Sequence, residues 1–204
     1  MNIITISREF GSGGRELGKR LADLLGYDYY DREIITAIAE QRGLDEDYVE
    51  NALANRIWQT IPLTFHRSFT GAGMMQQIQT DLLIEQKRII EGIAKAGRNC
   101  VIVGRNADAI LAAKNPFTLF VCAEMDAKIL RCMQRVGKEE KLTYREIENN
   151  IRRIDKNRAK TREMIAGGEW GKCSSYHLTV NTTDWNMKEL APAVAEFASC
   201  WFRR

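Results

Sequence analysis

The residues of this chain best suited to chemistry lie near its N-terminus, in the segment SREFGSGGREL (residues 7–17). Gly11, Gly13, Gly14 and Arg15 stand between a short β-branched run and a run with leucines at helical spacing. A glycine turn from a strand into a helix leaves backbone N–H groups unpaired where the helix dipole adds partial positive charge. Phosphate groups bind at such turns, and an arginine at the helix start adds a full charge. The segment therefore predicts a phosphate-binding loop.

The loop does not match either of two common nucleotide-binding patterns. If its last Gly-Arg pair is taken as the Gly-Lys of GxxxxGK[ST], Glu9 occupies the first glycine position and Glu16 the Ser/Thr position. In the pattern GxGxxG, Gly11 and Gly13 fit, but Glu16 stands at the third glycine. A plain turn that binds no ligand is the alternative interpretation.

Arginines in the second half of the chain could supply further positive charge. Arg105 directly follows the apolar run NCVIVG, and ligands of open α/β sheets bind at the carboxyl ends of strands. A charged helical region also places several ionic side chains on one side of a helix, namely Arg152, Asp155, Arg158 and Arg162. Such a run is typical of a solvated face. The alternative is a mobile arm that lays arginines over transferring phosphates.

Strands and helices alternate along the chain and must position these groups. Apolar runs predict strands at 2–6, 99–105, 117–123 and 176–182. The segment YDYYDR (27–32) is a candidate for a second, short strand that ends near Asp31. Helical spacing is found after the glycine loop, over most of 33–95, in 126–166 and in the final segment. Because the strands show no polar alternation, we expect an α/β fold with a mostly parallel sheet covered on both faces.

The composition of the chain is that of a globular protein without a strong charge bias. Its 204 residues suit one domain, and 45% hydrophobic with 28% charged residues is ordinary for a globular protein. A net charge of +3, from 30 basic and 27 acidic residues, indicates neither a nucleic-acid nor a membrane partner. The five cysteines have no zinc-like spacing. The first residues lack a signal-peptide pattern and no run reaches ~18 apolar residues, so we expect a cytoplasmic protein.

Five segments, in order, resemble the cytidylate kinase-like family, which are P-loop relatives of bacterial CMP kinase among the nucleoside monophosphate kinases. They are ITISREFGSGGRELGKRLA, YYDRE, VIVGRNAD, RIDKNRAKTREM and W…YHLTVNT, and the resemblance covers nearly the whole chain. It implies one kinase-like domain, a P-loop kinase core with a five-stranded parallel sheet flanked by helices. By position, the core comprises residues 1–38, 86–136 and 171–204, with a nucleotide-monophosphate-binding insert at about 39–85 and a lid at about 137–170.

The resemblance also implies an activity and a set of site residues. The reaction is transfer of the ATP γ-phosphoryl group to a nucleoside monophosphate resembling CMP or dCMP, with Mg²⁺, so small-molecule nucleotides are the expected partners. ATP is assigned to Gly11, Ser12, Gly13, Gly14, Arg15, Glu16, Asn181 and Thr182. The acceptor is assigned to Asp31, Arg105, Asp155 and Arg158. The implied catalytic set is Arg15, Asp31, Arg131, Arg158 and Arg162, and no metal ligand is assigned.

Departures from the family pattern leave two other functions open. The phosphate-binding lysine is absent, with Arg15 as its stand-in, and an acidic residue after the third strand is replaced by Val103. The small pair that follows Asp31 in CMP kinases is here Arg32-Glu33. One alternative is a nucleotide-binding regulator that keeps the fold without turnover. The other is a dinucleotide-binding protein with Asp31 on a ribose hydroxyl group.

Overall fold

The computed structural model describes residues 1–53, 70–135 and 142–204. Its chain divides into two compact units, the first formed by Met1–Asp31 with Gly97–Arg204 and the second by Arg32–Ala96. Parts of the predicted insert (54–69) and of the predicted lid (137–141) lie outside the described residues. The insert and lid boundaries therefore stay predictions.

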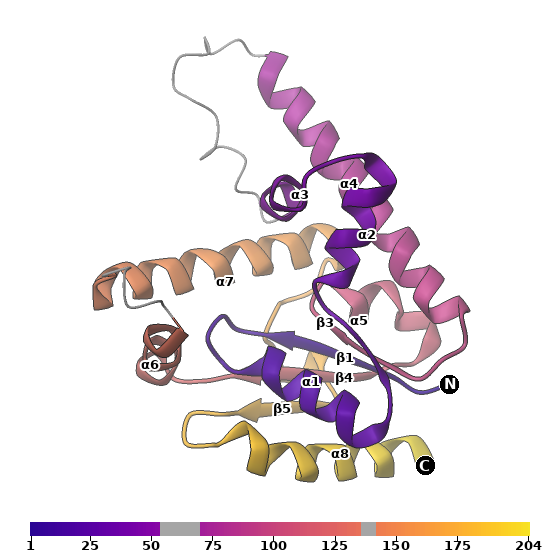
Figure 1. The fold of residues 1–204 in the computed structure, drawn as a ribbon, viewed down its shortest axis with the longest axis vertical. Helices are drawn as coiled ribbons and strands as arrows, with labels where there is room; N and C mark the ends of the chain where they lie inside the picture. The colour runs from indigo at the N-terminus through magenta and orange to yellow at the C-terminus, as the bar shows by residue number, and fades with distance from the viewer. Residues whose placement is uncertain (54–69, 136–141) are drawn as a thin grey trace. The chain divides into compact units, whose positions relative to one another are not determined.

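The first unit is built on a five-stranded sheet whose strands are all parallel (Figure 1). Its strands are β1 (Ile3–Arg8), β2 (Asp28–Tyr30), β3 (Cys100–Val103), β4 (Phe117–Cys122) and β5 (Leu178–Asn181). The sheet order is β2-β3-β1-β4-β5, so the central β1 is bordered by β3 and β4. This confirms the predicted α/β fold. It also brings the carboxyl ends of β2, β3 and β1 side by side at one edge.

Helices of the first unit cover both faces of this sheet. They are α1 (Gly14–Leu25), α5 (Ala107–Ile110), α6 (Met125–Arg135), α7 (Tyr144–Ala166) and α8 (Met187–Arg203). In Figure 1, α1 and α8 lie together on one side of β1 and β4, and α7 lies on the other side. The region predicted as one charged helical stretch is two helices. The second begins at a capping box, in which Thr143 and Glu146 exchange hydrogen bonds.

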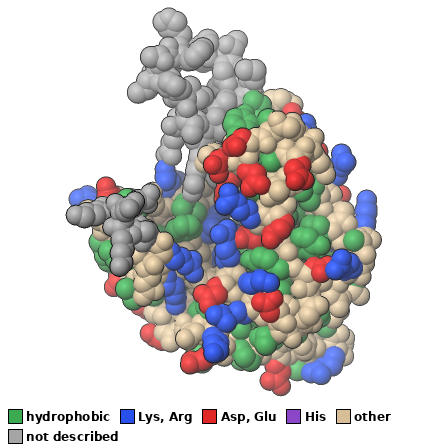
Figure 2. All heavy atoms as spheres, viewed as in Figure 1, with side chains coloured by type: hydrophobic (Ala, Val, Ile, Leu, Met, Phe, Trp, Pro, Cys, Tyr) green, Lys and Arg blue, Asp and Glu red, His purple; other side chains and the backbone are tan. Residues whose placement is uncertain are grey.

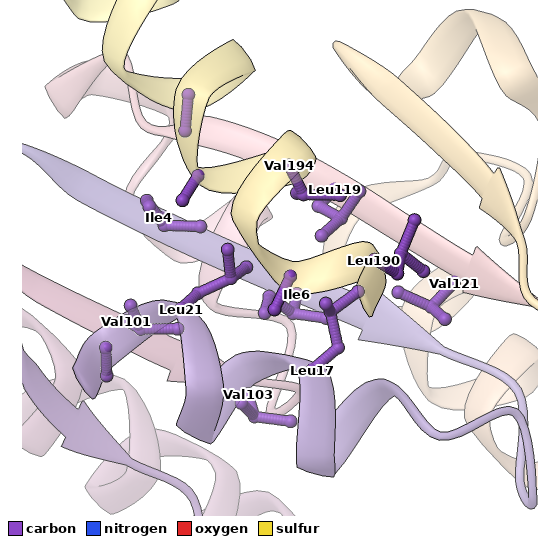
Figure 3. Close-up of a cluster of buried hydrophobic side chains, with 14 of the residues drawn as sticks. Ile4, Ile6, Leu17, Leu21, Val101, Val103, Leu119, Val121, Leu190 and Val194 are labelled. Carbon is purple, nitrogen blue, oxygen red and sulfur yellow. The ribbon is translucent and has the colours of Figure 1, made fainter. Parts of the chain in front are cut away.

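Apolar side chains of α1 and α8 pack against the sheet to form the core of the first unit (Figure 3). The helices contribute Leu17, Leu21, Leu190 and Val194. The strands contribute Ile4, Ile6, Val101, Val103, Leu119 and Val121. Because the three central strands are buried along their length, they read as continuous apolar runs, as the sequence pattern required. This packing fixes where β1 ends and α1 begins.

The second unit is helical in its described part. Its helices are α2 (Glu33–Arg42), α3 (Glu46–Leu53) and α4 (Thr70–Lys95), and each packs on the other two. Ile35, Ile38 and Val49 are fully buried among them, as is Ile90 of α4. The helical periodicity predicted for 33–95 is confirmed in α2 and in the larger, C-terminal part of α4. For residues 70–77 the two glycines Gly71 and Gly73 predict an irregular connection, and this prediction is wrong, because α4 already begins at Thr70.

Charged side chains of both signs are interspersed over the face drawn in Figure 2. This pattern follows from the near-equal numbers of basic and acidic residues. None of the described helices is both long enough and apolar enough to cross a bilayer.

Candidate functional site

The glycine loop connects β1 to α1. Gly11 (φ 79°) and Gly13 (φ 83°) adopt the left-handed conformation that glycine reaches without steric cost. A Cβ atom at Gly11 would lie 2.9 Å from the carbonyl oxygen of Lys128, so the loop packs directly on α6. Gly13 is the N-cap of α1 and has no side chain with which to cap the first turn. The loop therefore leaves the positive end of α1 without a side-chain cap from its N-cap residue.

Two buried hydroxyl groups fix the shape of this loop. Thr182 Oγ1 lies 2.6 Å from the carbonyl oxygen of Ser12 and 3.1 Å from that of Cys122. Ser12 Oγ donates to the carbonyl oxygen of Glu9 at 2.8 Å. Ser12 and Thr182 are both 0% exposed. The sequence assigned both to ATP, and the structure places their side chains inside the protein. The Ser12 hydroxyl group bonds within the loop, and that of Thr182, which follows β5, joins the loop to β4.

A buried ionic group holds the loop from the side of α6 and α7. Lys128 Nζ lies 3.0 Å from Glu9 Oε2 and 3.6 Å from Asp155 Oδ2. Asp155 Oδ1 accepts a hydrogen bond from the Phe10 N–H at 2.7 Å, and Glu9 Oε2 accepts one from the Ala123 N–H at 3.1 Å. Burial raises the pKa of Asp155, although the Phe10 N–H opposes this. Asp155, predicted to face the acceptor, is thus engaged with the backbone of the glycine loop.

Four arginines meet beside the loop. Arg158 Nη1, from α7, donates to the carbonyl oxygen of Arg8 at 2.9 Å. The pKa of Arg8 is lowered to about 9, chiefly by burial; the charges of Arg158, Arg105 and Arg15 contribute to the lowering, and Asp31 opposes it. Burial likewise lowers the pKa of Arg158 to about 10, with Arg105 and Arg15 acting in the same direction. Positive side chains that repel one another in a partly buried place create a strong attraction for an anion.

Asp31 is the carboxylate beside these arginines. It follows β2, its side chain is 4% exposed, and its Oδ2 lies 2.5 Å from Arg15 Nε. Its Oδ1 lies 3.5 Å from Arg8 Nη2. Asp31 therefore orients two of the four guanidinium groups. It follows β2, which is separated from β1 in the sheet only by β3.

The turn after β3 carries the third arginine in an uncommon backbone conformation. Gly104, Arg105 and Asn106 have φ values of 74°, 58° and 54°. Left-handed backbone costs a non-glycine residue roughly 1–2 kcal/mol. Such strain concentrates at functional sites, where the surrounding structure maintains it. The turn therefore supports a role in binding for Arg105.

Two other arginines assigned to catalysis have acceptors within the protein. Arg162 Nη1 donates to Asp108 Oδ2 at 2.6 Å, and both side chains are buried. Arg131 donates to Thr182 Oγ1 at 3.3 Å and to the carbonyl oxygens of Thr182 and Thr183. Arg131 and Arg162 thus bond to partners other than those of the four arginines beside the glycine loop.

The remaining residues assigned to ATP lie on the surface near their own partners. Asn181 Oδ1 accepts hydrogen bonds from the N–H of Thr183 at 3.0 Å and from its Oγ1 at 2.6 Å. Glu16 Oε1 accepts from Arg20 Nη2 at 2.8 Å. Asn181 is exposed, so it remains accessible to a ligand after making this turn.

Four residues of this region were missed by sequence reasoning. Arg8 ends a buried strand, and the rule that singled out Arg105 applies to it equally. Glu9, Lys128 and Asp108 could not be identified from the sequence, because each takes part in an ion pair with a residue far away in the chain. Only the tertiary structure joins these partners.

A family model described as the cytidylate kinase-like family matches residues 3–184. The chain belongs to the cytidylate kinase-like family. This confirms the resemblance carried by the five sequence segments. A search of curated proteins finds no match.

Solved structures share the fold of this family member at low sequence identity. An uncharacterized protein from Eubacterium ventriosum is 21% identical, with a TM-score of 0.70 over 98% of this chain and 99% of that one. Shikimate kinase from Bacteroides thetaiotaomicron is 15% identical, with a TM-score of 0.57 over 97% and 98% of the two chains. Shikimate kinase from Acinetobacter baumannii, in complex with shikimate, is 12% identical, with a TM-score of 0.53 over 97% and 92%. The fold is therefore that of the P-loop kinases.

The described residues of this cytidylate kinase-like protein do not fit a resident magnesium site. They include no cluster of three or more metal-ligating side chains of the His, Cys, Asp and Glu types. Asp31, the carboxylate nearest the glycine loop arginines, is engaged by Arg15 and Arg8. Magnesium is usually bound through one or two carboxylates together with the phosphates of a substrate. Any magnesium would therefore arrive with the nucleotide.

Proposed function

We propose that this protein transfers the γ-phosphoryl group of ATP to a nucleoside monophosphate, with CMP or dCMP as the acceptor class. The main observation in favour is that four arginines come together beside the N-terminus of α1, namely Arg8, Arg15, Arg105 and Arg158. Phosphoryl transfer asks little covalent chemistry of a protein and depends on positioning and positive charge. Membership of the cytidylate kinase-like family supports the choice of acceptor.

In this proposal the loop and the arginines have separate tasks. The uncapped first turn of α1 and Arg15 hold the phosphates of ATP, which enters with its own magnesium. Arg105, on the strained turn after β3, holds the acceptor phosphate, because a planar guanidinium group matches phosphate geometry. Arg158 on α7 adds charge where the two ligands meet.

A nucleotide-binding regulator without turnover is the second candidate. It is favoured by two departures from the family pattern, the absent phosphate-binding lysine and the acidic residue replaced by Val103. The dinucleotide-binding alternative gains no support, because the sheet order β2-β3-β1-β4-β5 differs from the order 3-2-1-4-5 of that fold.

An acceptor panel separates the enzyme from the regulator. The protein is incubated with MgATP and with CMP, dCMP, UMP or shikimate, and ADP formation is followed. We expect turnover with a pyrimidine monophosphate. Firm ATP binding without turnover on any acceptor would support the regulator instead.

Two variants test the assignment of ligands within the site. Arg15→Ala should weaken ATP binding and Arg105→Ala should weaken acceptor binding, each by about tenfold, because a charge-assisted hydrogen bond contributes roughly 1.5–3 kcal/mol. Lys19→Ala, which removes an exposed cation of α1, is the matched control. Isothermal titration measures all three, and unchanged affinities for both ligands in the site variants would remove the assignment.

A further inference from the structure

Strand and helix bounds limit the register of the phosphate-loop pattern on this chain to two possibilities. The pattern GxxxxGK[ST] lies between the end of a strand and the start of a helix. Here β1 ends at Arg8 and α1 begins at Gly14. These bounds admit the pattern at residues 9–16, the register taken from the sequence, or at residues 8–15. The close contact between positions 8 and 14 favours residues 8–15, which puts Arg8 at the first glycine position, Gly14 at the lysine position and Arg15 at the Ser/Thr position. Gly13 then matches the second glycine of the pattern.

Two of the three departures in this register, those at positions 8 and 14, touch one another. A Cβ atom at position 14 would lie 2.6 Å from Arg8 Cβ and 3.0 Å from Arg8 Cγ. The φ angle of Gly14 lies outside the left-handed region, so its backbone does not require glycine. Glycine at this position is explained by the space that Arg8 occupies. A lysine at position 14 and an arginine at position 8 therefore exclude each other.

The guanidinium group of Arg8 is directed toward the edge of the sheet where ligands of this fold bind. It fills the volume that a Cβ atom of Gly104 would need, just beyond the end of β3. Its Nη2 lies 3.5 Å from Asp31 Oδ1, just beyond the end of β2. The order β2-β3-β1 thus brings a cation from β1 over two neighbouring strand ends. The side chain is 13% exposed, which leaves a small face of it open.

We propose that Arg8 replaces the missing loop lysine as the cation that holds the transferring phosphate, and that the exchange of Arg8 and Gly14 is one coupled change. Three observations carry this: the collision between positions 8 and 14, the placement of the guanidinium group at the strand ends, and the proximity of Arg158. The ligand class is the polyphosphate of a nucleoside triphosphate. The inference rests on the proposed function for its choice of ligand.

A mutant cycle tests the coupling by restoring the first glycine and the lysine of the pattern. Arg8→Gly together with Gly14→Lys creates G-E-F-G-S-G-K over residues 8–14. ATP and inorganic tripolyphosphate are titrated by calorimetry, and thermal unfolding is followed without ligand. We expect Arg8→Gly to bind both probes at least about tenfold more weakly. Gly14→Lys alone should melt at a lower temperature, and the double variant should recover both melting temperature and affinity, needing only a small shift of Val121.

The controls keep the outcome clear. Arg8→Gln preserves side-chain bulk and reports on affinity if Arg8→Gly does not fold, and Lys19→Gln removes an unrelated cation of α1. Unchanged tripolyphosphate affinity in Arg8→Gln would overturn the proposal, as would a double variant that binds no better than Arg8→Gly. These readouts need no turnover. If the protein transfers phosphate to no acceptor but the variants show the expected affinities, the proposed function is wrong and the inference about Arg8 still holds.

Discussion

Two groups of arginines in the same unit differ in how many other arginines surround them. Arg162 and Arg131 donate to acceptors of the protein, a buried carboxylate in one case and backbone carbonyl groups in the other. Arg8 and Arg158 also have acceptors, since Arg8 lies 3.5 Å from Asp31 and Arg158 donates to the Arg8 carbonyl oxygen. In addition, the charges of at least two further arginines lower the pKa of each of them. The first arrangement is satisfied within the chain. In the second arrangement the arginines repel one another, and a bound anion would offset this repulsion.

The difference teaches how to divide charges between structure and ligand binding. A buried cation with a dedicated carboxylate contributes to the cohesion of the fold, and breaking such a pair is strongly destabilising. A cluster of like charges opposes folding and is typical of binding sites, where perturbed groups concentrate. Alanine variants of the first group should therefore change stability, and variants of the second group should change affinity.

The largest expected effect is on the Arg162–Asp108 pair. Arg162→Ala leaves the Asp108 carboxylate, 4% exposed, without its cation, and should lower the free energy of unfolding by about 3 kcal/mol. Urea denaturation measures this change. Replacing both partners, Arg162→Met with Asp108→Asn, should recover part of the loss. A decrease below about 0.5 kcal/mol, the range of an ordinary surface substitution, would break the division between the two groups.

Arg158 should show the converse behaviour. Arg158→Gln should reduce the affinity for MgATP by about tenfold, since it removes a charge-assisted contact, while relief of repulsion limits the change in stability to about 1 kcal/mol or less. Calorimetry and urea denaturation on the same samples give both numbers. Lys19→Ala, at an exposed pair worth about 0.3–0.5 kcal/mol, should leave MgATP affinity as it is. A large loss of stability with intact affinity would place Arg158 in the structural group.

Substitution of Thr182 should have a smaller effect, on both the free energy of unfolding and the affinity for ATP. Thr182→Val removes the hydroxyl group that lies 2.6 Å from the Ser12 carbonyl oxygen and should lower the free energy of unfolding by about 1 kcal/mol. Because the glycine loop loses a contact with β5, ATP affinity should fall by a few-fold, on the order of 1 kcal/mol or less. Thermal unfolding and calorimetry measure the two changes. Thr182→Ser keeps the hydroxyl group, and equal behaviour of the two variants would contradict this role.

The strand-loop-helix order and the positions of the glycines could be predicted because they depend on local properties. Continuous apolar runs predicted β1, β3 and β4, and the burial of these strands on both faces is visible in the sequence itself. The role of Asp155 could not be predicted in the same way. Its helical spacing with Arg158 placed both on one side of α7, but the partner of its carboxylate is the Phe10 N–H, 145 residues away in the chain.

The sequence by itself determined that a glycine loop leads from a buried strand into a helix, and that an arginine follows another buried strand, because these features are set by neighbours along the chain. The tertiary structure decided which arginines face one another and which are engaged by the protein. It also decided that Arg8 takes the space beside Gly14. The physical reason is that like-charge clusters, buried ion pairs and steric exclusion all depend on side chains from distant segments, and the sheet order alone brings those segments together.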